Sequence, residues 1–553
     1  MSRPYLKRRF ILLAMLAVIV AGTSSVLATD FFRSISNNIR TYNSVVKNLL
    51  AEYVDDIDSE ELIDASIEGM LRNLDPYTVF IHEEDQSAVT MLTKGKYGGV
   101  GIRLGVREGT LTVISPMEGT PAQRAGVRPG DKIIKIDSIS TEDLNTDNAA
   151  RKIRGKPGTR VILTFERIGE HEPFPVELTR EEIKINDLPY YGVQDGIGYI
   201  RLTRFSRATS KQFSDALEDL IKQGLTGLVL DLRDNPGGLL RDAVSMVDAL
   251  VEPGVSIVET RGRTKKAMRN HTSRNEPVLP AAMPVTVLVS GGSASASEIV
   301  AGAIQDLDRG VIIGDRTFGK GLVQSIFPLN NNKSIKMTTA KYYIPSGRLI
   351  QKEDYLHNGV LTDGLDKSDS LFYTRSGRVV KGGGGITPDI EISNESLPPL
   401  SRQLWAKSMF FAFATQSGDK YNLETTVVVN DAMVEDFQAF IADKEIEPVF
   451  PGENNLHDFE ETLEELEGFQ GTVDLRELQT YFDGKHASAF DDEREHIRKG
   501  LRLEFAGIAG GLAERIKSSL EDDVVYQKAV ELIHDEATYL ATLQPGGDEL
   551  SGK

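Results

Sequence analysis

The chain has 553 residues, of which 40% are hydrophobic and 26% are charged, an ordinary composition for a globular protein with room for three or four domains. It contains no cysteine, which excludes disulfides and thiolate metal sites. The net charge is −19, and 34 acidic against 14 basic residues after position 390 account for it, which argues against nucleic-acid binding by that region.

The amino terminus has the pattern of a secretory signal. Basic residues at positions 7–9 precede the apolar run 10–21, and small residues follow as far as Ala28, the predicted cleavage point. The run holds about a dozen residues, short of the roughly 20 that a membrane span needs. We therefore expect export to the periplasm. Residues 1–28 are then either removed, leaving a soluble protein, or retained as an inner-membrane anchor.

Residues 34–94 are expected to be helical, because apolar side chains such as Ile39, Tyr42 and Leu49 recur at helical spacing. A turn at positions 75–77 ends the repeating pattern. We interpret this region as a packing element without chemistry of its own.

Residues 95–182 change to short strands separated by glycines. Strands are expected at 111–115 and 160–167, and a helix at 145–154. With the Ala-Gly-Val-Arg-Pro-Gly-Asp-Lys-Ile sequence at 125–133, this region resembles a PDZ domain. A small β module with glycine-rich hairpins and no peptide-binding role is the alternative.

The PDZ resemblance implies a groove between the strand that follows Gly101 and the helix at 145–154. A protein tail would add to this strand, and backbone N–H groups would hold its terminal carboxylate. The residues implied in this contact are Gly99, Val100, Gly101 and Ile102.

Residues 183–395 alternate between strand and helix patterns. The predicted strands are 197–202, 227–233, 285–289 and 311–313, with a helix at 210–223. The continuous apolar run at 285–289 is typical of a strand that is buried on both faces of a sheet. A mixed α/β core is therefore expected here.

Residues 396–553 contain acidic helical segments, including 459–469, 491–512 and 522–535. This extension is a candidate surface for homo-oligomer formation or for an adaptor partner. A solvated packing appendage is the alternative. The predicted fold class is a multidomain α/β protein with a mixed α/β core, a PDZ-like β domain, an N-terminal helical segment and a C-terminal helical extension.

The clearest chemical signal is a serine followed by a lysine 25 residues later. Residues 290–298 read Ser-Gly-Gly-Ser-Ala-Ser-Ala-Ser-Glu, which places Ser295 on a small-residue turn that opens a helix. Lys320 lies in a Gly-Lys-Gly step, and neither segment contains a histidine. A lysine that loses its proton in a desolvated site can activate a serine nucleophile.

Other residues have places around this pair. The free N–H of Ala296 at the helix start could hold an oxyanion, with a second donor from the glycine-rich loop 231–239. Gln324 follows Lys320 by four residues and is placed to hydrogen-bond its amine. Asp306, on the same predicted helix as Ser295, is expected to be a structural partner.

With the 231–238 loop and the PDZ-like region, these motifs resemble the carboxy-terminal processing peptidases, also called tail-specific proteases. The likeness covers about residues 40–395, and Ser290 departs from the asparagine that relatives often have. The resemblance implies Ser295 as nucleophile, Lys320 as general base and Gln324 as the residue that orients the lysine. It also implies an oxyanion hole formed by the amides of Ala296 and of Gly237 or Gly238.

The predicted function is that of an exported serine endopeptidase that recognises unstructured carboxyl termini. No metal or nucleotide cofactor is expected. The alternative is a non-catalytic PDZ adaptor that delivers envelope proteins to another protease. Whether an empty PDZ groove inhibits the protease site stays open at this point.

Overall fold

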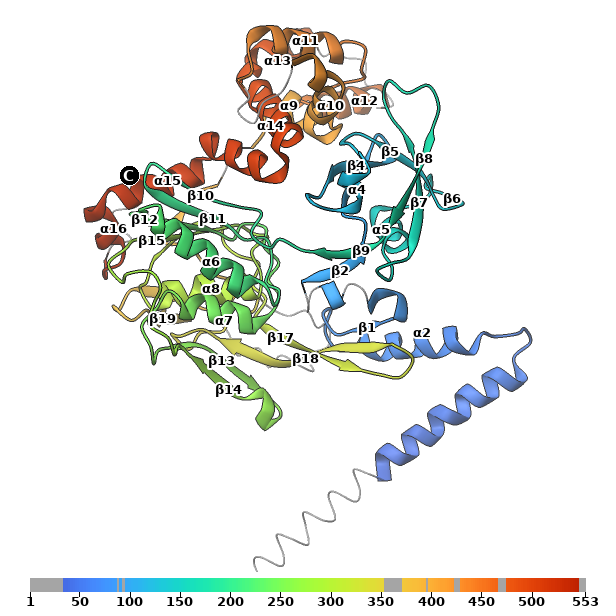
Figure 1. Cartoon of the computed structure of the whole chain (residues 1–553), viewed down its shortest axis with the longest axis vertical. Coiled ribbons are helices and arrows are strands. Elements are labelled where there is room, and N and C mark those ends of the chain that lie inside the picture. The colour runs from blue at the N-terminus through green and yellow to red at the C-terminus, as the bar shows by residue number, and fades with distance from the viewer. Residues whose placement is uncertain are drawn as a thin grey trace, which may run out of the picture. The chain divides into compact units, whose positions relative to one another are not determined.

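The computed structural model describes residues 33–86, 89–91, 95–352, 370–393, 396–421, 428–465 and 474–546. The chain divides into two compact units, Met1–Phe80 and Ile81–Lys553 (Figure 1). Among the residues that the structure describes, no helix combines the length and the apolar composition needed to cross a membrane. The predicted signal or anchor at residues 1–28 lies outside the described ranges.

The first unit is mostly helical. Residues 33–52 form a helix, and α2 (Ser59–Leu71) follows, with the side chain of Asp58 accepting hydrogen bonds from the first turn of α2. The expectation of helix throughout residues 34–94 is wrong at β1 (Val79–Ile81), a strand followed by the short 3-10 helix η1 (Glu83–Asp85). Local helical spacing ends at the 75–77 turn, and the next residues are β-branched or aromatic, which favours a strand.

The PDZ region contains an antiparallel sheet with two helices. Its strand order is β3-β4-β5-β7-β8, with β6 paired to β5, and β2 and β9 pair separately as an antiparallel ribbon. The elements are β2 (Lys96–Gly99), β3 (Ile102–Arg107), β4 (Thr110–Pro116), α4 (Pro121–Arg124), β5 (Lys132–Ile136), β6 (Ile139–Ser140), α5 (Thr146–Ile153), β7 (Arg160–Glu166), β8 (Phe174–Thr179) and β9 (Glu181–Lys184). The predicted strands and helix of this region agree with β4, β7 and α5.

The core contains a six-stranded sheet in the order β10-β11-β12-β15-β16-β21. All neighbouring strands are parallel except β10 and β11. The strands are β10 (Tyr190–Gln194), β11 (Ile197–Arg201), β12 (Gly227–Asp231), β15 (Val285–Val289), β16 (Val311–Gly314) and β21 (Ile390–Glu391), and the interleaved helices are α6 (Thr209–Lys222), α7 (Leu240–Asp248) and α8 (Ala296–Asp306). The loops after β12 and β15 emerge at the same edge of the sheet, because these two strands are parallel neighbours.

A second, antiparallel set of strands lies beside this sheet and was not predicted. Strand β13 pairs with β14 and with β18, and β17 pairs with β18. The elements are β13 (Ser256–Gly262), η2 (Lys265–Ala267), β14 (Arg269–Thr272), β17 (Leu322–Pro328) and β18 (Ser334–Tyr343), and a small separate pair is formed by β19 (Leu371–Tyr373) and β20 (Val379–Lys381).

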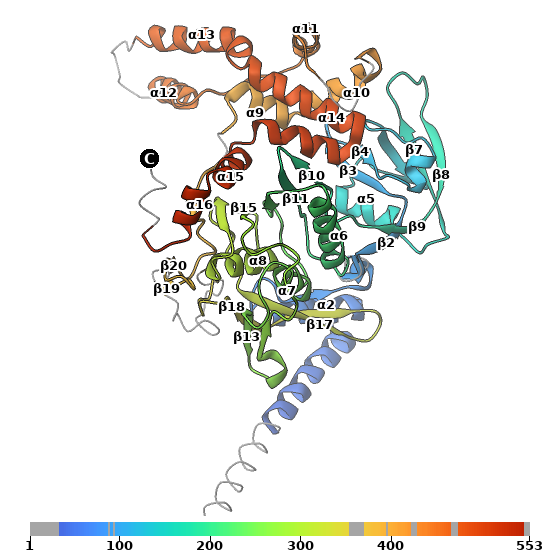
Figure 2. The ribbon, with the colours of Figure 1, turned by 60° about the vertical axis from the view of Figure 1, so that its left-hand side comes forward.

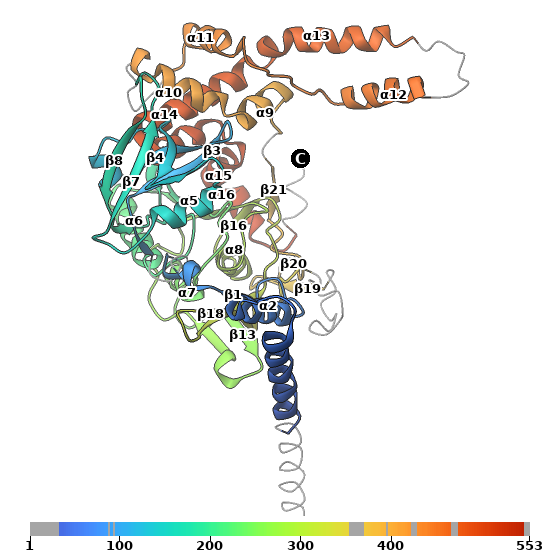
Figure 3. The same ribbon diagram turned by 90° about the vertical axis from the view of Figure 1, so that its right-hand side faces the viewer.

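The C-terminal extension is helical, as expected. Its elements are α9 (Pro399–Ala406), α10 (Met409–Tyr421), α11 (Asp431–Ile441), α12 (Glu453–Glu465), α13 (Arg476–Asp492), α14 (Arg494–Ser519), η3 (Leu520–Asp522), α15 (Val524–His534) and α16 (Glu536–Thr542). Its first part has an aromatic core that includes Phe410, Phe413, Phe437 and Phe505. Figure 3 shows α12 and α13 running side by side away from this core.

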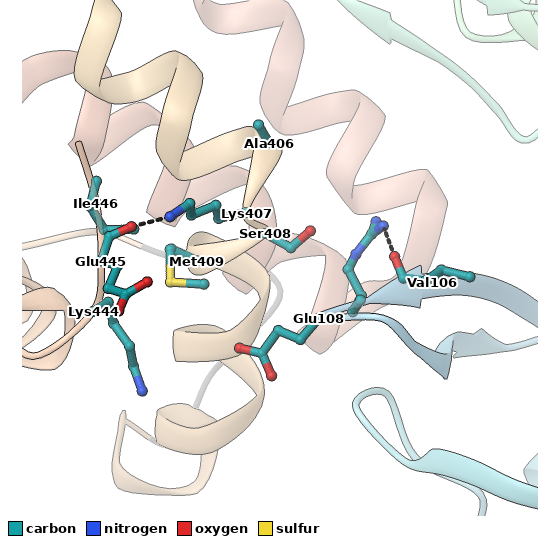
Figure 4. Close-up of a pocket in the computed structure, with 10 residues that line it drawn as sticks. Val106, Glu108, Ala406, Lys407, Ser408, Met409, Lys444, Glu445 and Ile446 are labelled. Atoms are coloured by element: carbon teal, nitrogen blue, oxygen red, sulfur yellow. Dashed lines mark hydrogen bonds between the residues drawn. The ribbon is translucent and has the colours of Figure 1, made fainter. Parts of the chain in front are cut away.

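This first part of the extension meets the PDZ region. The β3–β4 hairpin and the extension line a cavity of about 440 Å³, with Glu108 on one side and Met409 and Ile446 on the other (Figure 4). The Lys407 ammonium donates to the backbone carbonyl of Glu445 beside it. The first part of the extension is therefore packed against the PDZ region, and its last part packs on the six-stranded sheet.

The extension changes partners at a break in α14. Gly511 has φ 71° and ψ −159°, a left-handed conformation that only glycine adopts without strain. Before the break, Leu501 and Phe505 belong to the aromatic core; after it, α15 and α16 pack on the six-stranded sheet.

The two faces of that sheet are covered by different helices (Figure 2). Successive strand residues point to opposite faces, and Val229 and Leu288 contact the α15–α16 layer while Leu228 and Val287 belong to the cluster that holds α6–α8. The buried side chains that α15, α16 and the preceding turn supply are Leu520, Val525, Tyr526, Ala529, Leu532, Ile533, Tyr539 and Leu543.

Candidate active site

Ser295 lies at a sharp turn between β15 and α8. Its φ of 56° and ψ of −110° fall outside the regions that a residue with a side chain prefers, so the turn is strained. A strand, a strained serine and a helix in this order place the hydroxyl at the edge of a sheet, as in the nucleophile elbow of hydrolases. Ser295 is half-buried, so a substrate can reach it.

The serines on either side of Ser295 have structural partners. Ser293 and Ser297 are fully buried, and their hydroxyls donate to the carbonyl oxygens of Leu232 and Asn235, each at 2.8 Å. Both acceptors belong to the loop after β12, so these serines fasten that loop to the Ser295 turn. Ser290 does the same at the rim, where its hydroxyl lies 2.9 Å from the Asp234 carboxylate.

The loop after β12 touches the Ser295 turn directly at Gly237. A Cβ on Gly237 would lie 2.8 Å from the Ala296 nitrogen and 2.9 Å from the Ser295 Cβ, so any side chain would clash. The φ of Gly237 is 93°, which also favours glycine. The close approach brings the backbone amides of the two segments together.

Among the described residues, two of the three amides implied in an oxyanion hole have no hydrogen-bond acceptor. The Gly237 N–H donates to the Asn235 Oδ1 at 2.9 Å. Within the described part of the chain, no acceptor is recorded for the N–H groups of Ala296 and Gly238. The backbone around Gly238 is fixed, because Phe205 accepts from Leu239 at 2.8 Å and donates to Gly237 at 3.0 Å.

Glu298 joins the serine turn to the lysine turn. Its fully buried carboxylate accepts from the amides of Ser295 (2.7 Å), Gly319 (2.7 Å) and Lys320 (2.9 Å), and from the Thr317 hydroxyl (2.7 Å). Burial raises the pKa of Glu298, and these four donors oppose the rise. The carboxylate therefore holds the backbones of Ser295 and Lys320 in one cluster.

Sequence reasoning assigned no role to Glu298. The available signal was its position three residues after Ser295, which is the spacing of a helix capping box. Its amide donors on the lysine turn come from a distant segment, and spacing along the chain does not reveal them.

Tyr342 on β18 forms a second link between the two turns. Its hydroxyl donates to the Lys320 carbonyl at 2.6 Å and lies 3.0 Å from the Ser295 carbonyl. Burial raises the pKa of Tyr342 well above its usual value, with the charge of Glu298 adding to the rise, so the hydroxyl keeps its proton. Lys320 itself is half-buried.

Gln324 and Asp306, the other two residues singled out from the sequence, each have a side-chain partner. Gln324 is on β17, the strand that leaves the lysine turn, and its amide donates to the Thr338 hydroxyl at 3.3 Å. The expected contact with the lysine amine stays a prediction. Asp306 ends α8 and pairs with the fully buried Arg348 at 2.8 Å. Within the described ranges, no group of three or more His, Asp or Glu side chains is placed to hold a metal ion.

A buried charge cluster supports the base of the loop after β12. Asp231, the last residue of β12, is fully buried and pairs with Arg233 at 2.6 Å and with Arg201 at 2.7 Å. Burial alone would raise the pKa of Asp231, but the two arginines outweigh it and hold the pKa below its usual value. The Tyr199 hydroxyl donates to the same carboxylate at 2.7 Å.

The predicted carboxylate-binding segment of the PDZ region is the link between β2 and β3. Gly99 ends β2, Ile102 begins β3, and Val100 and Gly101 lie between them. The link is held from behind, because the Val100 carbonyl accepts from Ala122 at 3.0 Å and the Gly101 carbonyl accepts from Met117 at 2.8 Å.

A cavity of about 610 Å³ lies beside this segment. Ile102 and Leu104 of β3 and Ala150 of α5 form one part of its lining, which is the predicted groove. Thr203 and Arg204, from the loop after β11, line another part. The groove therefore faces the core segment that leads to Phe205 and Gly238.

Sequence profiles match four parts of the chain: an Activating protease CtpB N-terminal domain at residues 28–85, a PDZ domain at 112–167, Peptidase family S41 at 196–364, and a Probable PDZ-protease C-terminal helical domain at 400–533.

Two curated relatives are similar over most of their length. A carboxy-terminal-processing protease of Bartonella bacilliformis is 39% identical over 59% of this chain and 75% of its own. The carboxy-terminal processing protease CtpA of Bacillus subtilis is 32% identical over 61% of this chain and 72% of its own. A solved photosystem II D1 C-terminal processing protease aligns with 27% identity over 64% of this chain and 86% of its own, with a TM-score of 0.37. The chain belongs to the carboxy-terminal processing protease family and is a serine-type peptidase with a PDZ domain.

Proposed function

We propose that this protein is an exported endopeptidase that cuts protein substrates near their carboxyl termini, with Ser295 as nucleophile and Lys320 as general base. The observation that carries the proposal is the Glu298 carboxylate, which bonds the backbone amides of both residues. It joins a strained serine turn to the single lysine of the 315–321 loop, next to two unoccupied amides.

The chemistry begins with a neutral Lys320 amine. As the Ser295 oxygen attacks the peptide carbonyl, the amine takes the hydroxyl proton, and the N–H groups of Ala296 and Gly238 bind the oxyanion that forms. The lysine ammonium then donates this proton to the departing peptide amine, which leaves an acyl-enzyme. Water attacks the ester with the lysine again as base, and the ammonium then returns its proton to the Ser295 oxygen as the carboxylate product leaves.

The PDZ domain supplies substrate recognition in this proposal. A tail enters the cavity between β3 and α5 as an added strand, and the amides of Gly99, Val100 and Gly101 bind its terminal carboxylate. Because Arg204 lines the same cavity, a bound tail would contact the segment that continues into Phe205. Phe205 is bonded to both neighbours of Gly238, so tail binding and the oxyanion hole share a backbone connection.

A mass-spectrometric digest tests the catalytic part. The substrate is a stably folded carrier protein with an unstructured, apolar carboxyl tail, and the variants are wild type and Ser295→Ala. We expect the wild type to shorten the tail and Ser295→Ala to leave the intact mass unchanged. Trimming by Ser295→Ala at the wild-type rate would remove Ser295 from the mechanism.

Recognition of the carboxylate has its own test. The same tail is made as a free peptide with either a carboxylate or an amide end, and binding is measured with Ser295→Ala to prevent cleavage. We expect the amidated peptide to bind at least about tenfold more weakly, since a charge-assisted hydrogen bond to backbone N–H groups is lost. Equal affinity would place tail recognition elsewhere.

Export rests on the basic, apolar and small-residue order of positions 1–28. Cell fractionation with N-terminal sequencing tests it. We expect the mature protein outside the cytoplasm, beginning at position 29 if the signal is removed. A cytoplasmic protein that retains residue 1 would contradict export.

A further inference from the structure

The C-terminal extension contacts the loop after β12, which carries Gly238, through a buried ion pair. The guanidinium of Arg233 donates to both carboxylate oxygens of Asp523, at 2.9 and 2.5 Å. The two side chains are only 12% and 11% exposed, so water screens this pair weakly. Asp523 lies between η3 and α15, 290 residues away along the chain.

Arg233 is held from two sides. It donates to the Asp231 carboxylate through Nε at 3.0 Å and through Nη2 at 2.6 Å, while Asp523 binds the outer edge of the same guanidinium. Because Asp231 ends β12 and Arg233 begins the loop to Gly238, this clamp sets the direction in which the loop leaves the sheet. Arg201 pairs with the other side of Asp231.

Each arginine of this cluster has a second carboxylate partner besides Asp231: Arg201 lies 3.9 Å from the exposed Asp234, and Arg233 pairs with Asp523 of the extension. Asp231 faces both arginines, and Asp523 supplies the second buried negative charge beside Arg233. Removing one partner from a buried pair leaves an uncompensated charge, which is strongly unfavourable. Without Asp523, the guanidinium of Arg233 would be drawn toward solvent and would carry the loop with it.

A second contact fixes α15 over the same cluster. The Tyr526 ring packs edge-to-face on Tyr199, with 5.5 Å between ring centroids. The Tyr199 hydroxyl donates to Asp231, so the start of α15 contacts Asp231 through Tyr199 and contacts Arg233 through Asp523.

We propose that Asp523 is a positioning residue for the oxyanion loop, holding Arg233 so that the Gly238 amide stays directed at the substrate carbonyl. The proposal rests on the proposed Ser295–Lys320 mechanism. It makes the extension a part of the catalytic apparatus in addition to any role in assembly. Asp523 acts on the rate of the chemical step, because it does not line the PDZ groove that binds the tail.

A structural role must be separated from this one, because Asp523 also caps α15. Its carboxylate accepts from the amides of Val525 at 3.1 Å and Tyr526 at 3.2 Å. Asn and Ser both serve as N-caps but lack the negative charge, whereas Glu keeps the charge and caps poorly. Asp523→Asn and Asp523→Ser thus remove the ion pair and keep the cap, and Asp523→Glu does the reverse.

Asp535 offers a matched control in the same extension. It caps α16 by accepting from the Thr538 amide at 3.1 Å and the Thr538 hydroxyl at 2.6 Å. Asp535→Asn makes the same chemical change at a helix start, with no arginine of the catalytic loop involved.

The experiment measures steady-state cleavage of the tailed carrier protein by full-length variants, and their rate of labelling by a peptidyl phosphonate that forms a tetrahedral serine adduct. We expect Asp523→Asn and Asp523→Ser to lower kcat and the labelling rate about tenfold, less than the loss of an oxyanion donor outright. KM should stay within about twofold, since the groove is untouched. Asp523→Glu should regain most of the rate, and Asp535→Asn should match the wild type.

A wild-type kcat in Asp523→Asn or Asp523→Ser would overturn the proposal. An equal fall of kcat in Asp535→Asn would also overturn it. So would a fall of kcat in Asp523→Glu as large as that in Asp523→Asn, since the loss would then come from the helix cap and not from the ion pair. Failure of the mechanism itself gives a different result: Ser295→Ala would cleave and label like the wild type, whatever the Asp523 variants do.

Discussion

The two faces of the central sheet are covered by helices with different origins in the chain. Helices α6, α7 and α8 alternate with the strands they cover, whereas α15 and α16 come from the far end of the extension. Strand–helix alternation along the sequence predicts the first layer of helices but not the second. The comparison shows that an extension whose role composition left open can supply one of the two helical layers of a peptidase domain.

The largest effect on cleavage is expected from a substitution at the sheet edge, where the turns of Ser295 and Lys320 lie. Lys320→Ala should reduce tail cleavage by at least about 10³-fold, because in the proposed mechanism the serine loses its base. The melting temperature should stay near that of the wild type. Lys341, a half-buried lysine that pairs with Leu322 across β17 and β18, provides the control. Lys341→Ala should keep cleavage within about twofold, and full turnover in Lys320→Ala would exclude the lysine as base.

The two layers themselves are compared by a matched pair of core truncations. Leu217 on α6 and Leu532 on α15 are both buried, on opposite faces of the sheet. If both layers are core, Leu217→Ala and Leu532→Ala should each lower the free energy of unfolding by about 3 kcal/mol in urea titrations. A loss below about 1 kcal/mol for Leu532→Ala alone would make the second layer peripheral.

Within the first layer, two buried carboxylates on α8 separate catalysis from stability. Glu298→Gln turns an amide group toward the N–H donors of the serine and lysine turns, and the resulting displacement should lower kcat about 100-fold. Asp306→Asn disturbs the pair with Arg348, at the other end of α8, and should lower stability while kcat changes less than about threefold. Equal effects of the two variants on kcat would mean that Glu298 has no special role in positioning.

The smallest effect is expected on the pH dependence of the free energy of unfolding, through the buried carboxylate of Asp231. The pKa of Asp231 in the folded protein is below its unfolded value of 3.8, because Arg233 and Arg201 outweigh the effect of burial. The pairing therefore stabilises the fold fully above pH 3.8, and this stabilisation is lost as the pH falls below that value. Urea unfolding at pH 6, 4 and 3 should show a smaller acid-induced loss for Asp231→Asn than for the wild type, and parallel losses would contradict the assignment.

The parts of the fold that the sequence predicted depend on local patterns. The strands at 227–233 and 285–289, the helix at 145–154 and the helical extension follow from apolar periodicity and glycine turns. The structure also brings together the turns of Ser295 and Lys320, through Glu298, and places the loop of Gly238 against the Ser295 turn. Their catalytic roles stay predictions that the variants above test.

What the sequence did not predict depends on contacts between distant segments. The donors that meet Glu298, the Tyr342 hydroxyl on β18 and the pairing of Arg233 with Asp523 each join residues whose spacing follows no repeat. The strand at 79–81 was missed for the related reason that a helical pattern was extended past its turn. The continuous apolar run of β15 did indicate cover on both faces, but not which helices supply it.

The order in which the ribosome makes this chain gives the second layer a further consequence. The sheet strands β11, β12, β15 and β16 precede α15 in the chain. One apolar face of the sheet is therefore exposed to solvent until residues 524–542 are made. We therefore expect the peptidase domain to complete its core only when the extension is present. A chain that lacks residues 524–542 should leave this apolar face of the sheet exposed, as a surface on which chaperones would bind.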